Sequence, residues 1–177
     1  MIKPNLAWLT QEAYEKASLS ERALLWAAHE CDVLKVKEEP KGSNRGKRVD
    51  EYEKVFGLRG EPWCACFVGW CLTQAGGVKG KDFPNSALVA DWRKWATEHN
   101  KRHALPTRGS LGFLVHSNGT GHIFMVTKAL NEIDGWEFAT IEGNTNDEGS
   151  REGYEVCRRK RTLADLNNNH RWGFIQL

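Results

Sequence analysis

The sequence lacks any long apolar run: nothing in it approaches the roughly 18 consecutive apolar residues that a membrane-spanning helix needs. It also lacks an excess of charge of one sign, because 25 basic and 23 acidic residues leave a net charge of +2. This balance argues against nucleic acid or an anionic membrane surface as the main partner. The first residues lack the charged-then-apolar pattern of a signal peptide. We therefore expect synthesis in the cytoplasm and, for a target outside it, delivery or targeting by a separate partner or by the short N-terminal segment.

Cysteines are few and odd in number, so the five of them cannot all pair within one chain. Without an export signal, reduced thiols are expected. No CxxC pair is present, and Cys64 and Cys66 would lie on opposite faces of one helix, where they cannot share a tetrahedral ion. The sequence also lacks a calcium loop and a zinc-ligand set. We therefore expect no metal and no cofactor.

The length of 177 residues fits one domain with a short extension. Residues 1–19 are mildly amphipathic and are interpreted as an N-terminal helical extension. Residues 20–177 are interpreted as the main domain. The chain shows no internal repeat and no low-complexity segment.

Helical patterns fill the first half of the chain and strand patterns the second. Ser20 is the expected N-cap of the first long helix. Turn residues at Asn118-Gly119 and Asp134-Gly135 separate the strands. This order predicts an α+β fold, with N-terminal helices packed on a C-terminal antiparallel meander. The expected helices are 20–36, 49–56, 63–75 and 87–99, and the expected strands are 111–115, 122–128, 136–141, 154–159 and 172–177.

Cys64 falls in the first turn of a helix that is apolar almost all round. The free N–H groups and the dipole of a helix N-terminus favour a thiolate. At pH 7 a thiol with a pKa of about 8.5 is only about 3% ionised, whereas one shifted to about 6 is about 90% ionised. Cys71 lies two turns further along and is expected to be too deep to react. The alternative is that Cys64, Cys66 and Cys71 are all small core residues, the usual fate of free cysteine.

Two later segments carry polar side chains at strand ends. His122 opens an otherwise apolar strand, and by period two Thr140, Glu142 and Asn144 point the same way on the next strand. Adjacent antiparallel strands would bring Glu142 or Asn144 beside His122. The alternatives are a hydrogen-bonded histidine at a strand edge and a polar turn built by Asn and Gly. His116 is kept as a second candidate histidine.

Together these residues form an ordered set: a cysteine at a helix N-terminus, a histidine on a later strand and a polar side chain on the strand after it. Cysteine–histidine catalysis requires such a set. The histidine takes the thiol proton and later protonates the leaving amine, while the third group fixes the tautomer and orientation of the imidazole.

At this point the sequence resembles the CHAP domain, the amidase/peptidase branch of the NlpC/P60-like, papain-related cysteine hydrolases. The resemblance covers roughly residues 20–177, and the segments Asn44-Arg45-Gly46 and Val49-Asp50-Glu51-Tyr52 are also similar to the lead-in of bacterial and phage cell-wall hydrolases. One departure is Gly109-Ser110, where the family usually has Gly-Asp. The motifs are Pro62-Trp63-Cys64-Ala65-x-Phe67-Val68-x-Trp70, then Gly121-His122-Ile123-x-x-Val126, then Glu142-Gly143-Asn144.

The resemblance implies a papain-like NlpC/P60-type fold and cleavage of an amide bond in peptidoglycan stem peptides or their attachment, by a monomer acting on the cell wall. By motif, Cys64 is the nucleophile and His122 the general base and acid. Glu142 is the orienting partner, and Asn144 is a polar helper or the substitute third member. The backbone N–H of Cys64 is a candidate oxyanion donor, as helix N-termini supply such groups.

Three points stay open at the level of sequence. Trp63 adjoins the proposed nucleophile and is a candidate for substrate binding by stacking on sugar rings; the alternative is core filling. The basic run 158–161 either attracts anionic polymers or is the solvated end of an edge strand. The competing functions are a thiol acyltransferase or protease on the same scaffold, a non-catalytic wall-binding or toxin-like module, and a nucleic-acid binder.

Overall fold

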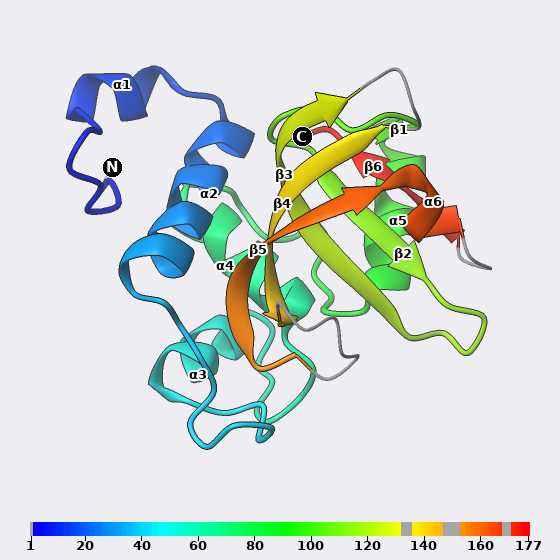
Figure 1. Cartoon of the computed structure of the whole chain (residues 1–177), viewed down its shortest axis with the longest axis horizontal. Helices are drawn as coiled ribbons and strands as arrows, with labels where there is room; N and C mark the ends of the chain where they lie inside the picture. Colours follow the sequence, from blue (N-terminus) through cyan, green and yellow to red (C-terminus); the bar gives the residue numbers. More distant parts are fainter. Residues whose placement is uncertain (1, 132–135, 147–152, 168–170) are drawn as a thin grey trace.

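The computed structural model describes residues 2–131, 136–146, 153–167 and 171–177 (Figure 1). Helices precede the sheet, as expected for an α+β fold. The helical elements that come before the sheet are α1 (Gln11–Lys16), α2 (Leu19–Ala28), the π-helical turn η1 (His29–Val33), α3 (Lys47–Lys54), α4 (Cys64–Gln74) and α5 (Val89–Glu98). The later elements are β1 (Arg102–His103), β2 (Leu111–Val115), β3 (Gly121–Asn131), β4 (Glu137–Thr145), β5 (Glu155–Thr162), α6 (Leu163–Asn167) and β6 (Arg171–Ile175).

The strands form one six-stranded antiparallel sheet in the order β1-β6-β2-β3-β4-β5. The predicted meander is confirmed for β2 to β5. It is wrong for β6, which crosses back after α6 and pairs with β2 instead of β5. In that position Phe174 and Ile175 are fully buried, one in each of the two cores of the domain. Burial on both faces therefore accounts for the place of β6 inside the sheet.

Helix boundaries differ from the prediction mainly in the first long helix. Its N-cap is Ser18, whose side chain accepts a hydrogen bond from the Glu21 N–H, and not Ser20. The α-helix ends at Ala28 and continues as the π-helical turn. The short elements β1 and α6 were not predicted, and the predicted turn at Asp134-Gly135 lies outside the described residues.

Two cores lie on opposite faces of the sheet. The larger one packs the helices against it and is centred on α4, whose residues 64–72 are all buried. The smaller one lies on the other face, beneath α6. Figure 1 shows α4 behind the sheet, between α2, α3 and the strands. Because α4 contacts both β3 and β4, its N-terminus is held beside the strands that carry the candidate histidine and carboxylate.

The N-terminal segment is packed onto the helical layer. Leu6, Leu9 and Tyr14 are buried, and the indole N–H of Trp26 donates to the Tyr14 hydroxyl at 2.9 Å. In the described part of the chain, no helix combines the length and the apolar character that crossing a membrane would require.

Candidate active site

Cys64 is the first residue of α4, and Trp63 is its N-cap. The first intrahelical hydrogen bond runs from the Phe67 N–H to the Trp63 carbonyl, so the earlier N–H groups of this turn are not used by the helix itself. Two backbone N–H groups, those of Ile123 and Ala65, donate to the Cys64 sulfur. The residue is 6% exposed, so the thiol lies just beneath the surface.

The imidazole of His122 lies between Cys64 and Glu142. It shares a hydrogen bond with the Cys64 thiol, and its Nε2 lies 2.7 Å from Glu142 Oε2. Because Nε2 is bonded to the carboxylate, Nδ1 is the ring nitrogen left for the sulfur. The His122 side chain is 17% exposed, which leaves one edge of the pair open to solvent.

Glu142 is fully buried on β4, and three other side chains hold its carboxylate in place. The Thr140 hydroxyl donates to Oε1 at 2.6 Å, as expected from their shared face. The Arg161 guanidinium binds both oxygens, with Nε 2.6 Å from Oε1 and Nη2 2.6 Å from Oε2. Burial opposes the charged form of Glu142, but Arg161 and His122 outweigh it and lower the pKa of this carboxyl. The carboxylate is thus ionised, oriented and bonded to the imidazole.

The two reacting groups are shifted towards an ion pair. Burial alone would raise the pKa of the Cys64 thiol, but the hydrogen bond and positive charge of His122 and the two backbone N–H groups lower it. Burial likewise disfavours imidazolium, yet Cys64 and Glu142 raise the pKa of His122 to about 9. Above the lowered pKa of Cys64 and below the pKa of about 9 of His122, the pair is a thiolate beside an imidazolium.

Glu142, and not Asn144, is the third member of this chain of contacts. The expectation that Asn144 shares the face of Glu142 is wrong, because β4 carries a bulge after Glu142 and Asn144 adopts a φ of 53°. Its Oδ1 accepts the backbone N–H of Trp63 at 2.9 Å, and its Nδ2 donates to the Gly153 carbonyl at 2.7 Å. Asn144 therefore holds the residue before the nucleophile.

The expectation that Trp63 stacks on substrate sugars is corrected by its burial. The side chain is fully buried, and its indole N–H donates to Glu38 Oε1 at 2.8 Å. The ring packs 5.8 Å from that of Tyr52. An indole enclosed in this way cannot line a groove, and the core-filling alternative describes it.

The basic run at the end of β5 is not a free cationic patch. The Arg161 side chain is 15% exposed in its pair with Glu142, so Arg161 belongs to the site, a role that was not predicted from the sequence. Arg158 pairs with Asp32 and Lys160 with Glu137, while Arg159 donates to the Asn146 carbonyl. Period two places Arg161 on the face of Cys157, the register partner of Glu142, but the register itself could not be read from the sequence.

The other cysteines differ from Cys64 in their environment. Burial raises the pKa of Cys66 to about 12, that of Cys31 to about 12 and that of Cys71 well above its usual value. No disulfide joins any of the five cysteines. The depth expected for Cys71 is confirmed, since it has no exposed surface.

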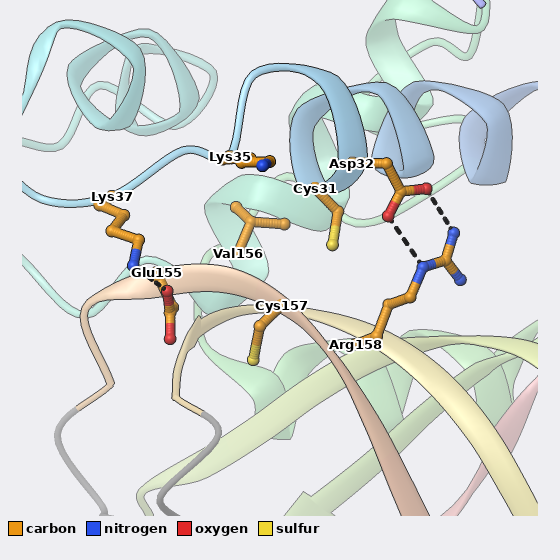
Figure 2. A pocket seen from close by; sticks show the side chains of 8 residues that line it. All are labelled: Cys31, Asp32, Lys35, Lys37, Glu155, Val156, Cys157 and Arg158. Atoms are coloured by element: carbon orange, nitrogen blue, oxygen red, sulfur yellow. Dashed lines mark hydrogen bonds and ion pairs between the residues drawn. The ribbon is translucent and has the colours of Figure 1, made fainter.

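A hollow of about 410 Å³ lies between η1 and β5, and its lining does not include Cys64, His122 or Glu142. Figure 2 shows two ion pairs across it, Asp32 with Arg158 and Lys37 with Glu155. The sulfur of Cys157 points away from Cys31, to the other side of the strand. His116, the reserve histidine, follows β2 in the turn that leads to β3.

The site thus joins a low-pKa thiol, an imidazole and a buried carboxylate, in the order Cys64, His122, Glu142. Among the described residues, no group of three or more His, Cys, Asp or Glu side chains is arranged to hold a metal ion. Residues 57–144 match the family model of the CHAP domain. The chain contains a CHAP domain.

CHAP domains are cysteine- and histidine-dependent amidohydrolase/peptidase domains related to NlpC/P60, and the family is generally hydrolytic on peptidoglycan. The match includes Cys64, His122 and Glu142 but ends before Arg161. Neither the curated proteins nor the solved structures contain a significant match to this chain.

Proposed function

We propose that this CHAP domain hydrolyses an amide bond of peptidoglycan, with the Cys64 thiolate as nucleophile. The observation that carries the proposal is the hydrogen-bonded chain from Cys64 through His122 to Glu142, in which the pKa of the thiol is lowered and that of the imidazole is raised. A cysteine that served only as core filling would have no partner holding it as a thiolate.

In the first half of the reaction the Cys64 sulfur attacks the carbonyl carbon of the scissile amide. The Cys64 backbone N–H, at the start of α4, supplies a hydrogen bond to the oxyanion that forms. The His122 imidazolium then gives its proton to the amide nitrogen, the C–N bond breaks and an amine leaves. A thioester between Cys64 and the acyl part of the substrate remains.

In the second half, neutral His122 takes a proton from water as the water attacks the thioester carbonyl. The C–S bond breaks, a carboxylic acid is released, and the thiolate–imidazolium pair is restored. Glu142 keeps the ring oriented throughout, since its carboxylate stays bonded to Nε2. The bond cut is the lactyl–L-alanine amide or a peptide bond in the stem or cross-bridge.

The test is digestion of purified cell walls by the whole chain, followed by mass analysis of the soluble fragments. Each cut must release one new amine and one new carboxylate, and their positions identify the bond. Cys64→Ala and His122→Ala should abolish release while leaving the circular dichroism spectrum unchanged. Full activity in Cys64→Ala, or transfer of the acyl group to an added amine in preference to water, would replace the hydrolase proposal.

A further inference from the structure

We propose that Glu38 and Glu53 are positioning residues for the nucleophile. They do this by holding residues 61–63, the segment that leads into Cys64. The indole N–H of Trp63 donates to Glu38 Oε1 at 2.8 Å, and the backbone N–H of Glu61 donates to Glu53 Oε1 at 2.7 Å. Both carboxyl groups come from outside residues 57–144, the region that matches the family.

The burial of these two carboxyl groups is the first argument. Glu53 is fully buried and Glu38 is 5% exposed. In the part of the chain that the structure describes, Oε2 of each residue is buried without a hydrogen-bond partner. Leaving a buried acceptor unsatisfied costs stability, so the protein does not gain from these residues as core filling. Each carboxyl group instead fixes the position of one N–H group in the segment before Cys64.

The second argument is that Trp63 connects this segment to the strand of the catalytic carboxylate. Its ring lies against Gly143, where an added Cβ would come 2.7 Å from Trp63 Cζ3. Its backbone N–H is held by Asn144. Gly143 and Asn144, which follow Glu142 in the bulge, therefore both contact Trp63, one at its ring and the other at its backbone N–H, and Glu38 sets the orientation of that ring.

Glu38 is itself anchored to the sheet. Its backbone N–H donates to the Tyr154 carbonyl at 2.7 Å, next to the bridge between Lys37 and Glu155 at the start of β5. Glu53 is anchored in α3, and its carbonyl accepts the N–H of Leu58. The segment before the nucleophile is thus held from β5, from α3 and from β4. Movement of any one anchor shifts Cys64 relative to His122.

The inference rests on the catalytic pairing of Cys64 with His122, but not on the substrate. Its direct readout is the rate at which iodoacetamide alkylates Cys64 as a function of pH, measured by mass spectrometry of the labelled peptide. Wild-type protein should react well below pH 8, because His122 holds the thiolate. In Glu38→Met the indole loses its acceptor, and the alkylation profile should move to higher pH, with at least a tenfold lower rate at pH 6.

The conservative variant separates hydrogen bonding from packing. Glu38→Gln keeps an amide oxygen for the indole N–H and should restore most of the rate at pH 6. Glu53→Met and Glu53→Gln should behave as the corresponding Glu38 variants. Glu39→Met is the matched control: Glu39 is adjacent to Glu38 in the chain but exposed, and its variant should show the wild-type profile.

Wall hydrolysis supplies the second readout. The Glu38→Met variant should lose kcat at least tenfold, per mole of folded and unlabelled protein, with KM changed less than twofold. If Glu38→Met does not fold, Trp63→Phe removes the same N–H from the other partner and should shift the profile in the same direction. A wild-type alkylation profile in either variant overturns the inference. A shifted profile in a chain whose wild type cuts no wall leaves the positioning role standing and removes the proposed substrate.

Discussion

His122 Nε2 and Glu142 Oε2 lie 2.7 Å apart, and the same Oε2 is 2.6 Å from Arg161 Nη2. Oε2 of Glu142 therefore binds both the imidazole of His122, which gains and loses a proton, and the guanidinium of Arg161, which stays charged. Since Arg161 also binds Oε1, the carboxylate cannot rotate without breaking a charged hydrogen bond. The orientation of the imidazole is thus fixed from behind by a buried ion pair.

Glu142→Gln should lower kcat/KM by roughly 10²-fold or more, because an uncharged amide neither stabilises the imidazolium nor fixes its tautomer. Because Glu142 contributes to the raised pKa of His122, the pKa of the imidazole should fall below about 9 in this variant. The measurement is hydrolysis of cell walls together with NMR titration of the His122 ring. Unchanged activity would show that the carboxylate does not orient the histidine.

The pH dependence of two reactions of Cys64 should differ at alkaline pH. Protonation of the leaving amine needs imidazolium, so hydrolysis should fall as the pH rises through about 9, the raised pKa of His122. Alkylation needs only the thiolate, which remains above that pH because the pKa of Cys64 is lowered. The two reactions are compared by stopped-flow labelling of Cys64 and by wall turnover from pH 6 to 10.5, which is roughly the range around the ordinary pKa values of His and Cys. Parallel loss of both reactions above pH 9 would contradict the assignment of the imidazolium as the acid.

Local sequence signals were enough for the elements that bear the site. Pro62 and the apolar run after it placed the helix that begins at Cys64, and alternation placed Thr140 and Glu142 on one face, where their side chains are 2.6 Å apart. These features depend on neighbours a few residues away in the chain. Period and capping chemistry express them directly.

Features that depend on contacts between distant parts of the chain could not be predicted from the sequence. Arg161 reaches Glu142 because β5 pairs with β4 in one register, and a shift by one residue would turn the guanidinium to the other face. Asn144 does not share the face of Glu142 because β4 has a bulge after Glu142. The extra residue of a bulge cannot be predicted from the alternation of side chains along a strand. The place of β6 beside β2 likewise follows from burial on both sides of the sheet.

Two arginines of β5 should differ sharply in their contribution to stability. Arg161→Met leaves the buried charge of Glu142 without its main partner and should cost about 3–5 kcal/mol of the free energy of unfolding. Arg158→Met removes a two-bond pair with Asp32 in which the side chains are 50% and 43% exposed, and should cost about 0–1 kcal/mol. Urea unfolding of both variants gives the comparison. Equal losses would mean that the Glu142 pair contributes no more than a surface ion pair.

Selective labelling should distinguish the cysteines. At pH 6.5, below the ordinary thiol pKa of about 8.5, Cys64 should react with iodoacetamide at least tenfold faster than Cys31, Cys66 and Cys71. The reason is that the pKa of the Cys64 thiol is lowered, whereas burial raises the pKa values of the other three thiols. Peptide mapping after partial reaction measures each rate. In His122→Ala the advantage of Cys64 should disappear, and its persistence there would assign the lowered pKa to the backbone N–H groups around the sulfur.

Gly143→Ala tests the close approach between β4 and α4. A Cβ at this position would lie 2.7 Å from the Trp63 ring and 2.8 Å from Phe67 Cβ, and neither group has space to retreat in a packed core. We expect a loss of about 1–3 kcal/mol in stability and a fall in the alkylation rate of Cys64 at pH 6, because the displaced indole moves the segment before it.

Gly173→Ala is the matched control for this change, since Gly173 also lies in a strand but its nearest neighbour would be a Phe113 ring carbon at 3.2 Å. Its stability loss should be smaller, and the alkylation rate of Cys64 should stay at the wild-type value because β2 and β3 separate β6 from β4, the strand that packs on Trp63. Thermal melts and alkylation rates are measured on both variants. If the two variants slow Cys64 equally, the effect is a general loosening of the sheet, and the specific connection from Gly143 through Trp63 to Cys64 is refuted.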